Sequence, residues 1–512
     1  MAARSSTTRD VHALLPLVVL LLTAVLLTLV NPVGYHGGGA DDWYYLQAAR
    51  CVVETKGLCL PHTHWAARFP LILPMAAAIS LIGETRLALT LVSLFFGLLS
   101  LALFWVAMKR QFGETTATIA GFAMLATPAF AILLTAVCVD TVELSAMLGA
   151  LICIQSAVRS QNRAWSVLAG ALLGIAVISR ATSLVLIPAA GLALLVSTAC
   201  RRHTLPFIAA AAGVLACEAM AYFWTTGSLF YGWHLALGHA HLSSAAIATP
   251  LAANESPLFN RHLIEGWKLS SGIHVHWMVD GLINLLLDSN INITLVGALG
   301  LLAVERQRAG KAAWLLALGA GYYFCALTYA LAIDPQPRMF MPVVAAASAI
   351  IGLLLAPLWR GRSRWFVGLF LATMLIESAV INRDSYELQS ADPVIAAWST
   401  EELGHTATDF STHTAMTLIP TLRALPVYDA GQGDVSGRNR LLIISAARCS
   451  DVLPGWTIAR RHAVARADPW AIEFLRRRHF LFRQHGQSAV CLFNRVSAAN
   501  AADPVPSRQN TR

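Results

Sequence analysis

The sequence has few charged residues for its length. Of 512 residues, 13% are charged and 56% are hydrophobic. A soluble globular chain of this size could not hide so much apolar surface, because about half of its area stays wet. The same composition excludes a disordered chain, a nucleic-acid-binding domain and a secreted disulfide scaffold. The chain is therefore expected to be a polytopic helical membrane protein.

The N-terminus lacks the cleavage site of a secretory signal peptide. An apolar stretch runs from Val11 to Val30, longer than a signal core, and no small-residue site follows it. The residues that do follow, from Asn31 to Gly34, are typical of a turn. We expect a first transmembrane helix whose N-terminus is cytoplasmic.

Apolar runs near the length of a bilayer recur along the chain and predict about eleven transmembrane helices. Short gaps between them hold basic residues, and the positive-inside rule assigns those gaps to the cytoplasm. The expected spans cover 11–30, 87–108, 115–135, 142–158, 164–179, 182–199, 205–225, 291–305, 312–332, 339–358 and 365–381.

Alternation of the spans requires that Pro70 to Gly83 does not cross, and we interpret this short segment as an interfacial or re-entrant helix. A transmembrane domain then covers 1–381, with a first outer loop at 31–86 and a long outer loop at 226–290. The less hydrophobic region 382–512 contains strand-like runs at Leu441 to Ser445 and Val490 to Phe493 and a helical patch from Trp470 to Arg478. It predicts a small extracytoplasmic α/β domain. The expected location is a bacterial inner membrane.

Four of the nine cysteines fall in the predicted outer regions. Cys51 and Cys59 lie close enough in sequence to bridge, and Cys449 and Cys491 are the other two. Free thiols stay the alternative for all four. No CxxC motif occurs, so a zinc ribbon is not expected.

The first outer loop concentrates the chemistry. After three glycines come the adjacent carboxylates Asp41 and Asp42, with Tyr45 one helical turn beyond Asp41. One carboxylate could point into a cavity while the other caps a helix. The simple alternative is a helix cap alone. Ionisable residues beside a bilayer are functional candidates by default.

A second acidic pair, Asp140 and Glu143, begins the fourth expected span on the same outer side. Its alternative role is again a helix cap with a first-turn acid. Arg180 and Arg338 lie singly in outer turns, where the planar guanidinium suits a phosphate. Their alternative is snorkelling to lipid head groups.

Further candidates in the first loop are Arg68, His62 and His64, and more histidines lie in the long outer loop. A His-x-His pair can supply two metal ligands, but the spacing matches no metal site known to us. We assign no metal ligand and no certain cofactor, and a divalent metal stays an alternative.

These motifs resemble the GT-C superfamily of lipid-phosphosugar glycosyltransferases. The similarity is closest to the branch of protein O-mannosyltransferases and aminoarabinose lipid A transferases. It covers about 1–235 by motif and 290–360 by layout. Two departures are Asp42 where the family usually has Glu, and Cys138 where relatives often carry a basic residue. The motifs that carry the resemblance are Asp41-Asp42, Arg68-Phe69-Pro70, Gly83-Glu84-Thr85-Arg86-Leu87, Lys109 to Gly113, Thr127-Pro128, Asp140, Leu168 to Gly174, Ser179-Arg180 and Gly227 to Tyr231.

The resemblance implies an inverting transfer of a sugar from a polyprenyl phosphate to an extracytoplasmic glycan, lipid or protein. Asp41 matches the family's catalytic position and is the expected base. Asp42 and Asp140 would orient the acceptor or tune Asp41, and Arg180 or Arg338 would stabilise the leaving phosphate. Tyr45, His62, His64, Arg68 and Glu143 complete the expected substrate contacts. Membrane lipids are expected partners and nucleic acid is not.

Two other classes stay open. A transporter or flippase would also bury charges, but it should show repeated halves with broken helices near the midplane. The sequence shows no internal repeat, and its acids cluster at one face. A non-catalytic scaffold for envelope assembly would not require acids at the start of two spans.

Overall fold

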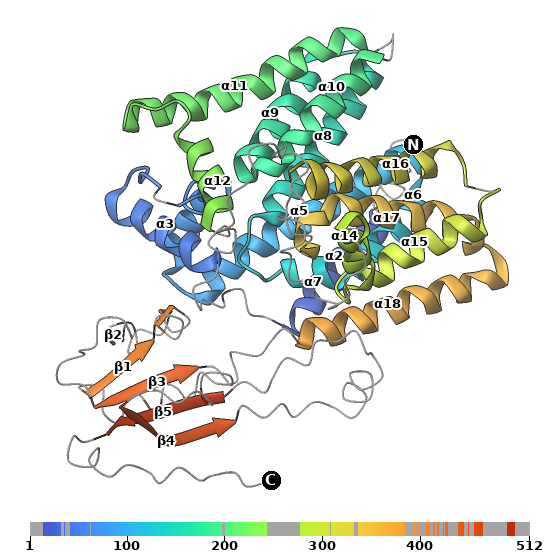
Figure 1. Ribbon diagram of the computed structural model, residues 1–512. Helices are drawn as coiled ribbons and strands as arrows, with labels where there is room; N and C mark the ends of the chain where they lie inside the picture. The colour runs from blue at the N-terminus through green and yellow to red at the C-terminus, as the bar shows by residue number, and fades with distance from the viewer. Residues whose placement is uncertain are drawn as a thin grey trace, which may run out of the picture. The chain divides into compact units, whose positions relative to one another are not determined.

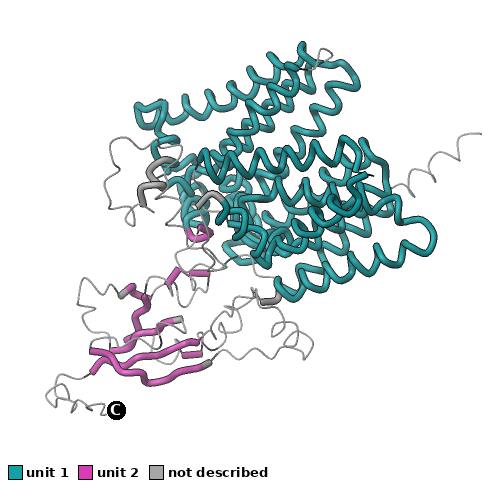
Figure 2. The backbone as a smooth tube through the Cα atoms, turned by 45° about the vertical axis from the view of Figure 1, so that its right-hand side comes forward, with its two compact units in different colours: residues 1–35, 44–385 teal, residues 36–43, 386–512 magenta. Residues whose placement is uncertain are grey.

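The computed structural model is mostly helical and divides into two compact units (Figures 1 and 2). Unit 1 comprises 1–35 and 44–385, and unit 2 comprises 36–43 and 386–512. The structure describes 14–31, 35, 41–61, 63–196, 200–242, 277–307, 309–331 and 336–384. Beyond these it describes 394, 397–398, 405–409, 413–414, 417–418, 423, 425–428, 439–444, 449, 455–463 and 489–496.

The first half of unit 1 contains the outer-loop helices and the helices that hold the candidate site, except that the first three residues of α3, Asp41 to Trp43, are grouped with unit 2. Within it α4 is a helix of 14 residues in the segment expected to be interfacial. The bounds are α2 Leu15–Thr28, α3 Asp41–Thr55, α4 Phe69–Ile82, α5 Arg86–Phe112, α6 Glu114–Leu125, α7 Pro128–Leu133, α8 Asp140–Ser160, α9 Arg163–Ser179, η1 Ala181–Val185, α10 Leu186–Val196, α11 Arg201–Thr226 and α12 Tyr231–Leu242.

The second half of unit 1 adds a further group of apolar helices. One turn of π-helix extends α16, and 3-10 turns flank α17. The bounds are α14 Trp277–Leu287, α15 Asn292–Val304, α16 Lys311–Cys325, η4 Ala326–Ala330, η5 Pro337–Phe340, α17 Met341–Leu355, η6 Ala356–Trp359, η7 Gly361–Ser363 and α18 Arg364–Asp384.

Helices occupy all eleven stretches expected to span, but the expected count of about eleven is not confirmed. Among the described residues, six helices are long and apolar enough to cross a bilayer, or seven if α14 and α15, bent by 106°, count as one. The helices α2, α4, α9 and η1–α10 are apolar but shorter. One expected span is broken, because Pro128 begins α7 after α6 has ended at Leu125.

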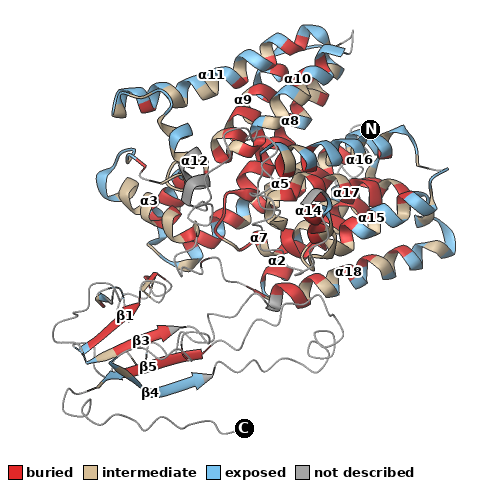
Figure 3. Cartoon of the chain, viewed as in Figure 1, coloured by how far each residue is buried: buried red, intermediate tan, exposed pale blue. Residues whose placement is uncertain are grey.

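The apolar surface of unit 1 fits a membrane. Large apolar side chains stay exposed on the outer faces of its helices, such as Leu205 at 77% and Phe366 at 76%. In water such a surface would be costly, whereas lipid chains cover it without loss. Buried residues line the inner faces of the helices, as Figure 3 shows. The chain is therefore a multi-pass membrane protein.

Close helix contacts depend on glycine. A Cβ built on Gly170 of α9 would lie 2.0 Å from the carbonyl oxygen of Phe207 in α11. A Cβ on Gly352 of α17 would lie 2.7 Å from the carbonyl oxygen of Thr116 in α6. Small residues let membrane helices approach closely. In lipid, where no hydrophobic effect drives helices together, this close van der Waals packing stabilises the bundle.

Unit 2 contains a five-stranded mixed sheet of order β2-β1-β3-β5-β4. The strand β1 runs parallel to β2 and β3, while β5 runs antiparallel to β3 and β4. The strand-like runs expected at 441–445 and 490–493 correspond to β3 and β5. A helical patch expected from Trp470 to Arg478 lies outside the described residues. The bounds are β1 Thr406–Asp409, β2 Val427–Tyr428, β3 Arg440–Ile444, β4 Trp456–Ala463 and β5 Ala489–Arg495.

Each unit contains one disulfide. Cys51 bonds to Cys59 in unit 1, and Cys449 bonds to Cys491 in unit 2. Both pairs fall in the regions that the sequence assigns to the outside. The five other cysteines are free and lie in or beside apolar helices. Disulfides form in oxidising compartments, so this division supports the predicted orientation of the chain.

Candidate functional site

The candidate site is built around the first turn of α8. Asp140 and Glu143 are 2% and 4% exposed, so both carboxylates are buried. The neighbouring α5 holds this turn, because the Ser100 hydroxyl donates to the carbonyl of Thr141 over 3.1 Å. A buried carboxylate needs a charged or hydrogen-bonded partner. Without one, removing the ion from water costs on the order of several kcal/mol.

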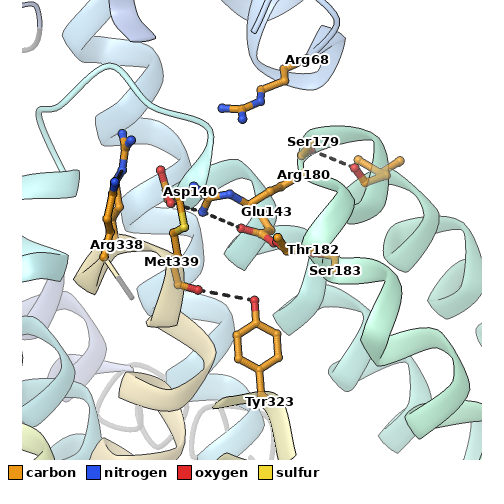
Figure 4. A network of polar contacts seen from close by, with 12 residues as sticks. Arg68, Asp140, Glu143, Ser179, Arg180, Thr182, Ser183, Tyr323, Arg338 and Met339 are labelled. Carbon is orange, nitrogen blue, oxygen red and sulfur yellow. Dashed lines mark hydrogen bonds and ion pairs between the residues drawn. The ribbon is translucent and has the colours of Figure 1, made fainter. Parts of the chain in front are cut away.

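Arg180 supplies that partner for both acids. It follows the last residue of α9, is 5% exposed, and donates through Nη1 to Asp140 Oδ1. The same nitrogen lies 3.5 Å from Oε2 of Glu143. The sequence predicted these three residues on one outer level, and the structure brings them into contact (Figure 4).

The other oxygen of Glu143 is held by hydroxyl groups. Ser183 Oγ donates to Glu143 Oε1 over 2.5 Å, and Thr182 Oγ1 donates over 3.3 Å. Both residues belong to η1, the turn directly after Arg180. Neither hydroxyl was expected from sequence to contact the acids, and only their position beside Arg180 could have indicated them.

Two further arginines face the same acids. In Figure 4 the Asp140 carboxylate lies between the side chains of Arg180 and Arg338, and the Arg68 guanidinium points towards this group from the first outer loop. The positive charges of all three arginines act on Asp140. The site thus combines three guanidinium groups with two carboxylates. This excess of positive charge suits an anionic group.

The additional arginines have their own orienting contacts. Arg68 donates to the hydroxyl of Tyr45, and its guanidinium carbon lies 5.6 Å from the centre of that ring. Arg338 Nε donates to Gln336 Oε1 over 3.1 Å. Both arginines are half-buried, whereas Arg180 is fully buried between its acids. Arg180 is therefore enclosed by the protein, whereas Arg68 and Arg338 are each partly exposed and could contact a ligand.

Aromatic side chains order the first outer loop. Tyr45 is fully buried, and Tyr44 stacks on Trp65 with ring centres 4.5 Å apart. The centre of the His64 ring lies 3.8 Å from the centre of the same tryptophan ring. His64 is thus placed in the aromatic part of the loop. His62 lies outside the described residues.

Asp41 and Asp42 begin α3, as expected. Asp42 is 5% exposed, and its Oδ1 accepts from the backbone N–H of Trp43 over 2.9 Å. This contact satisfies one of the backbone N–H groups of the first turn, which have no partner within a helix. Both acids are grouped with unit 2, whereas Asp140 belongs to unit 1. That Asp41 shares one pocket with Asp140 stays a prediction.

Cys138, the departure from the family pattern, is buried just before α8. Burial raises the pKa of the Cys138 thiol well above its ordinary value, and the adjacent Asp140 carboxylate acts in the same direction. The thiol therefore stays protonated and does not provide a thiolate nucleophile.

A metal centre finds no support among the residues that the structure describes. Within them, no three His, Cys, Asp or Glu side chains come together as metal ligands would. Of the histidines of the long outer loop, His234 is described within α12, while His262, His274 and His276 lie outside the described residues.

Comparison with known proteins identifies the fold. Residues 69–224 match the family model of dolichyl-phosphate-mannose-protein mannosyltransferase. No curated protein sequence matches the chain. The crystal structure of ArnT from Cupriavidus metallidurans in the apo state is similar with a TM-score of 0.50 and 14% identity, over 98% of this chain and 100% of that one.

Two more structures are similar at lower scores. ArnT from the same organism bound to undecaprenyl phosphate gives a TM-score of 0.45 at 12% identity, covering 95% of this chain and 98% of that one. The oligosaccharyltransferase of Archaeoglobus fulgidus in the apo form gives a TM-score of 0.48 at 13% identity, covering 84% of this chain and 69% of that one. Both scores lie below 0.5, so the fold comparison rests on apo ArnT. Residues 69–224 thus match this family model, and the chain shares its fold with apo ArnT.

Proposed function

We propose that the protein is an integral-membrane inverting glycosyltransferase. It moves a sugar from a polyprenyl-phosphate donor to a glycan, lipid or protein acceptor outside the cytoplasm. The name of the matching family, whose donor is a dolichyl phosphate sugar, supports this class of reaction.

The observation that carries the proposal is the set of three guanidinium groups around Asp140. Arg180 is already paired with two carboxylates, which it holds in place. Arg68 and Arg338 are directed towards the same group and are only half-buried (Figure 4). A phosphate ester at a membrane face needs such planar, permanently charged donors. Arg68 and Arg338 are therefore our assignment for the donor phosphate, with Arg180 as the residue that fixes the site.

The chemistry follows from the charges. When the C1–phosphate bond breaks, the leaving phosphate gains negative charge, and the arginines stabilise it more in the transition state than before. The acceptor hydroxyl must lose its proton as it attacks from the opposite face. Asp41 is our proposed base, with Asp42 and Asp140 orienting the acceptor. The apolar helices of unit 1 would hold the polyprenyl tail.

The proposed location is the bacterial inner membrane with a cytoplasmic N-terminus. The outer loops and the C-terminal unit then face the periplasm. The two disulfides, in the regions that this orientation places outside, and the basic gaps that it places in the cytoplasm support the proposal.

The test is transfer of radiolabelled sugar from a panel of polyprenyl-phosphate sugars to membranes that contain the wild type or a variant. Loss of the base in Asp41→Asn should lower turnover by about two orders of magnitude or more. Loss of one phosphate donor in Arg338→Gln should lower turnover by about a hundredfold. Arg362→Gln, an exposed arginine in a gap assigned to the cytoplasm, is the matched control and should retain activity.

The outcome also separates the alternative classes. A transporter would move the lipid-linked sugar without breaking its phosphate bond, so label would stay on the polyprenyl carrier. Normal transfer by a correctly inserted Asp41→Asn protein would remove Asp41 from the mechanism.

A further inference from the structure

The long helix α11 carries one acidic residue within an apolar span. Glu218 is the single acid among the 26 residues of α11, a helix long and apolar enough to cross a bilayer. A carboxylate in such a span is costly and is a candidate functional group by default. Glu218 takes no part in the arginine site described above, so it needs a separate explanation.

Helix packing places Glu218 at the level of that site. Gly174 of α9 faces Val214 and Ala211 of α11, and Gly170 faces Phe207 and Ala210 four residues earlier in both helices. The two helices therefore run in the same direction with a fixed offset. One further turn brings Glu218 level with the end of α9, where Arg180 follows.

A buried hydroxyl lies on the same face of α11. Tyr222 is one turn beyond Glu218 and is 4% exposed, yet its hydroxyl has no hydrogen-bond partner in the described part of the chain. The charge of Glu218 acts on this phenol. A buried polar group without a partner is rare and requires an explanation, such as a missing ligand.

Neighbouring helices fix the ring of Tyr222. A Cβ on Gly232 of α12 would lie 2.8 Å from Cε2 of Tyr222, so α12 packs directly on the ring. Phe69 of α4 and Tyr231 lie with ring centres 6.3 Å and 5.6 Å away. The Tyr231 hydroxyl donates to the carbonyl of Pro61 over 2.9 Å. Tyr222 is thus the hydroxyl of this cluster that is left for a ligand.

The Glu218 carboxylate differs from those of the arginine site in its partners. Within the described ranges it makes no hydrogen bond or ion pair, although it is half-buried. Asp140 and Glu143, in contrast, are held by Arg180 and by hydroxyl groups. A carboxylate in an apolar setting is stabilised by a cation with N–H donors.

We propose that Glu218 and Tyr222 form a binding subsite for the primary amine of a lipid head group. The ammonium would donate to the carboxylate and to the phenol oxygen, which accepts as well as donates. The lipid chains would lie along the exposed apolar residues of α11 near the subsite, such as Met220, Phe223 and Trp224. Ethanolamine phospholipids and amino-sugar lipids both carry this group. The subsite is separate from the proposed transfer reaction and stands if the transfer assay fails.

The test uses the full-length protein in phosphatidylglycerol nanodiscs and counts retained lipids by native mass spectrometry. Three arms add phosphatidylethanolamine, a glucosamine-headed glycolipid, or phosphatidylcholine, whose quaternary ammonium has no N–H. We expect at least one amine lipid to be retained in preference to phosphatidylcholine, and the arm that succeeds identifies the source. Glu218→Gln should weaken that retention about tenfold, the loss typical of one charge-assisted hydrogen bond.

Two further variants test whether misfolding causes the loss of lipid retention. Tyr222→Phe keeps the ring packing and should weaken retention about threefold, as for a neutral hydrogen bond. Glu114→Gln removes an acid that pairs with Lys109 on another helix, and should leave retention unchanged. Equal retention of all three lipids, or equal losses in Glu218→Gln and Glu114→Gln, would overturn the proposal.

Discussion

Arg180 contacts two carboxylates inside the helix bundle. Pairs of this kind gain little over well-packed apolar residues, but removing one partner leaves an uncompensated buried charge. Asp140 and Glu143 both depend on Arg180, while Glu143 also has Ser183 and Thr182. The two acids are therefore held in place by one shared cation and two hydroxyl groups.

Replacing Arg180 with methionine should destabilise the protein by about 3–5 kcal/mol, because two buried acids lose their cation. The measurement is thermal unfolding of the purified protein in detergent. A triple variant that adds Asp140→Asn and Glu143→Gln removes the stranded charges and should recover part of the loss. An unfolding temperature unaffected by Arg180→Met would show that the pair contributes nothing to stability.

Much of this site could be predicted at the residue level from sequence. The acids and the arginines stood out because each lies at the end of an apolar run, where a charge has to be explained. Ser183, Thr182 and Tyr323 did not stand out, since hydroxyl groups are common beside membrane helices. In the structure, Tyr323 donates to the carbonyl of Met339, one residue after Arg338, at 3.5 Å (Figure 4). Such contacts arise only when distant helices meet.

At the scale of elements, α9 and α11 are held together by glycine contacts. Gly170→Ala would place a Cβ 2.0 Å from a backbone oxygen of α11, which no side-chain rotation relieves. The helices must separate, and we expect a loss of about 3 kcal/mol, as in overpacked cores. Unfolding in detergent and the yield of monodisperse protein are the measurements.

Gly213→Ala is the matched control for that prediction. Gly213 is also within α11, but a Cβ there meets no atom within 4 Å. Alanine favours a helix over glycine, so stability should be unchanged or slightly raised. Similar losses in both variants would mean that the α9–α11 contact is not the cause.

Sequence located the helices better than it located their breaks. Apolar length predicted a helix at each of eleven places, and each is helical. The break at Thr127 divides one expected span into the short helices α6 and α7. The bend of 106° between α14 and α15 leaves neither of them long enough to span alone. Composition averages over a window and so misses a local turn, even where Pro128 marks one.

At the scale of the whole molecule, the orientation that we propose from the disulfides and the basic gaps can be tested by labelling. We expect Ala459→Cys, in exposed strand β4, to react with a membrane-impermeant maleimide in intact spheroplasts. Arg362→Cys, between α17 and α18, should react only after permeabilisation. The exposed Cys217 and Cys325 would first be changed to serine. The opposite labelling pattern would place the C-terminal unit in the cytoplasm.

The sequence by itself determined that this is a membrane protein, where its helices lie, and which charges need an explanation. These properties follow from the cost of placing polar groups in lipid, and that cost depends on residue type and run length alone. Only the tertiary structure decided that Arg180 joins Asp140 to Glu143, and that within the described part of the chain the Tyr222 hydroxyl is buried without a hydrogen-bond partner. Those outcomes depend on how helices pack and on the space that a glycine leaves between them, which no single segment encodes.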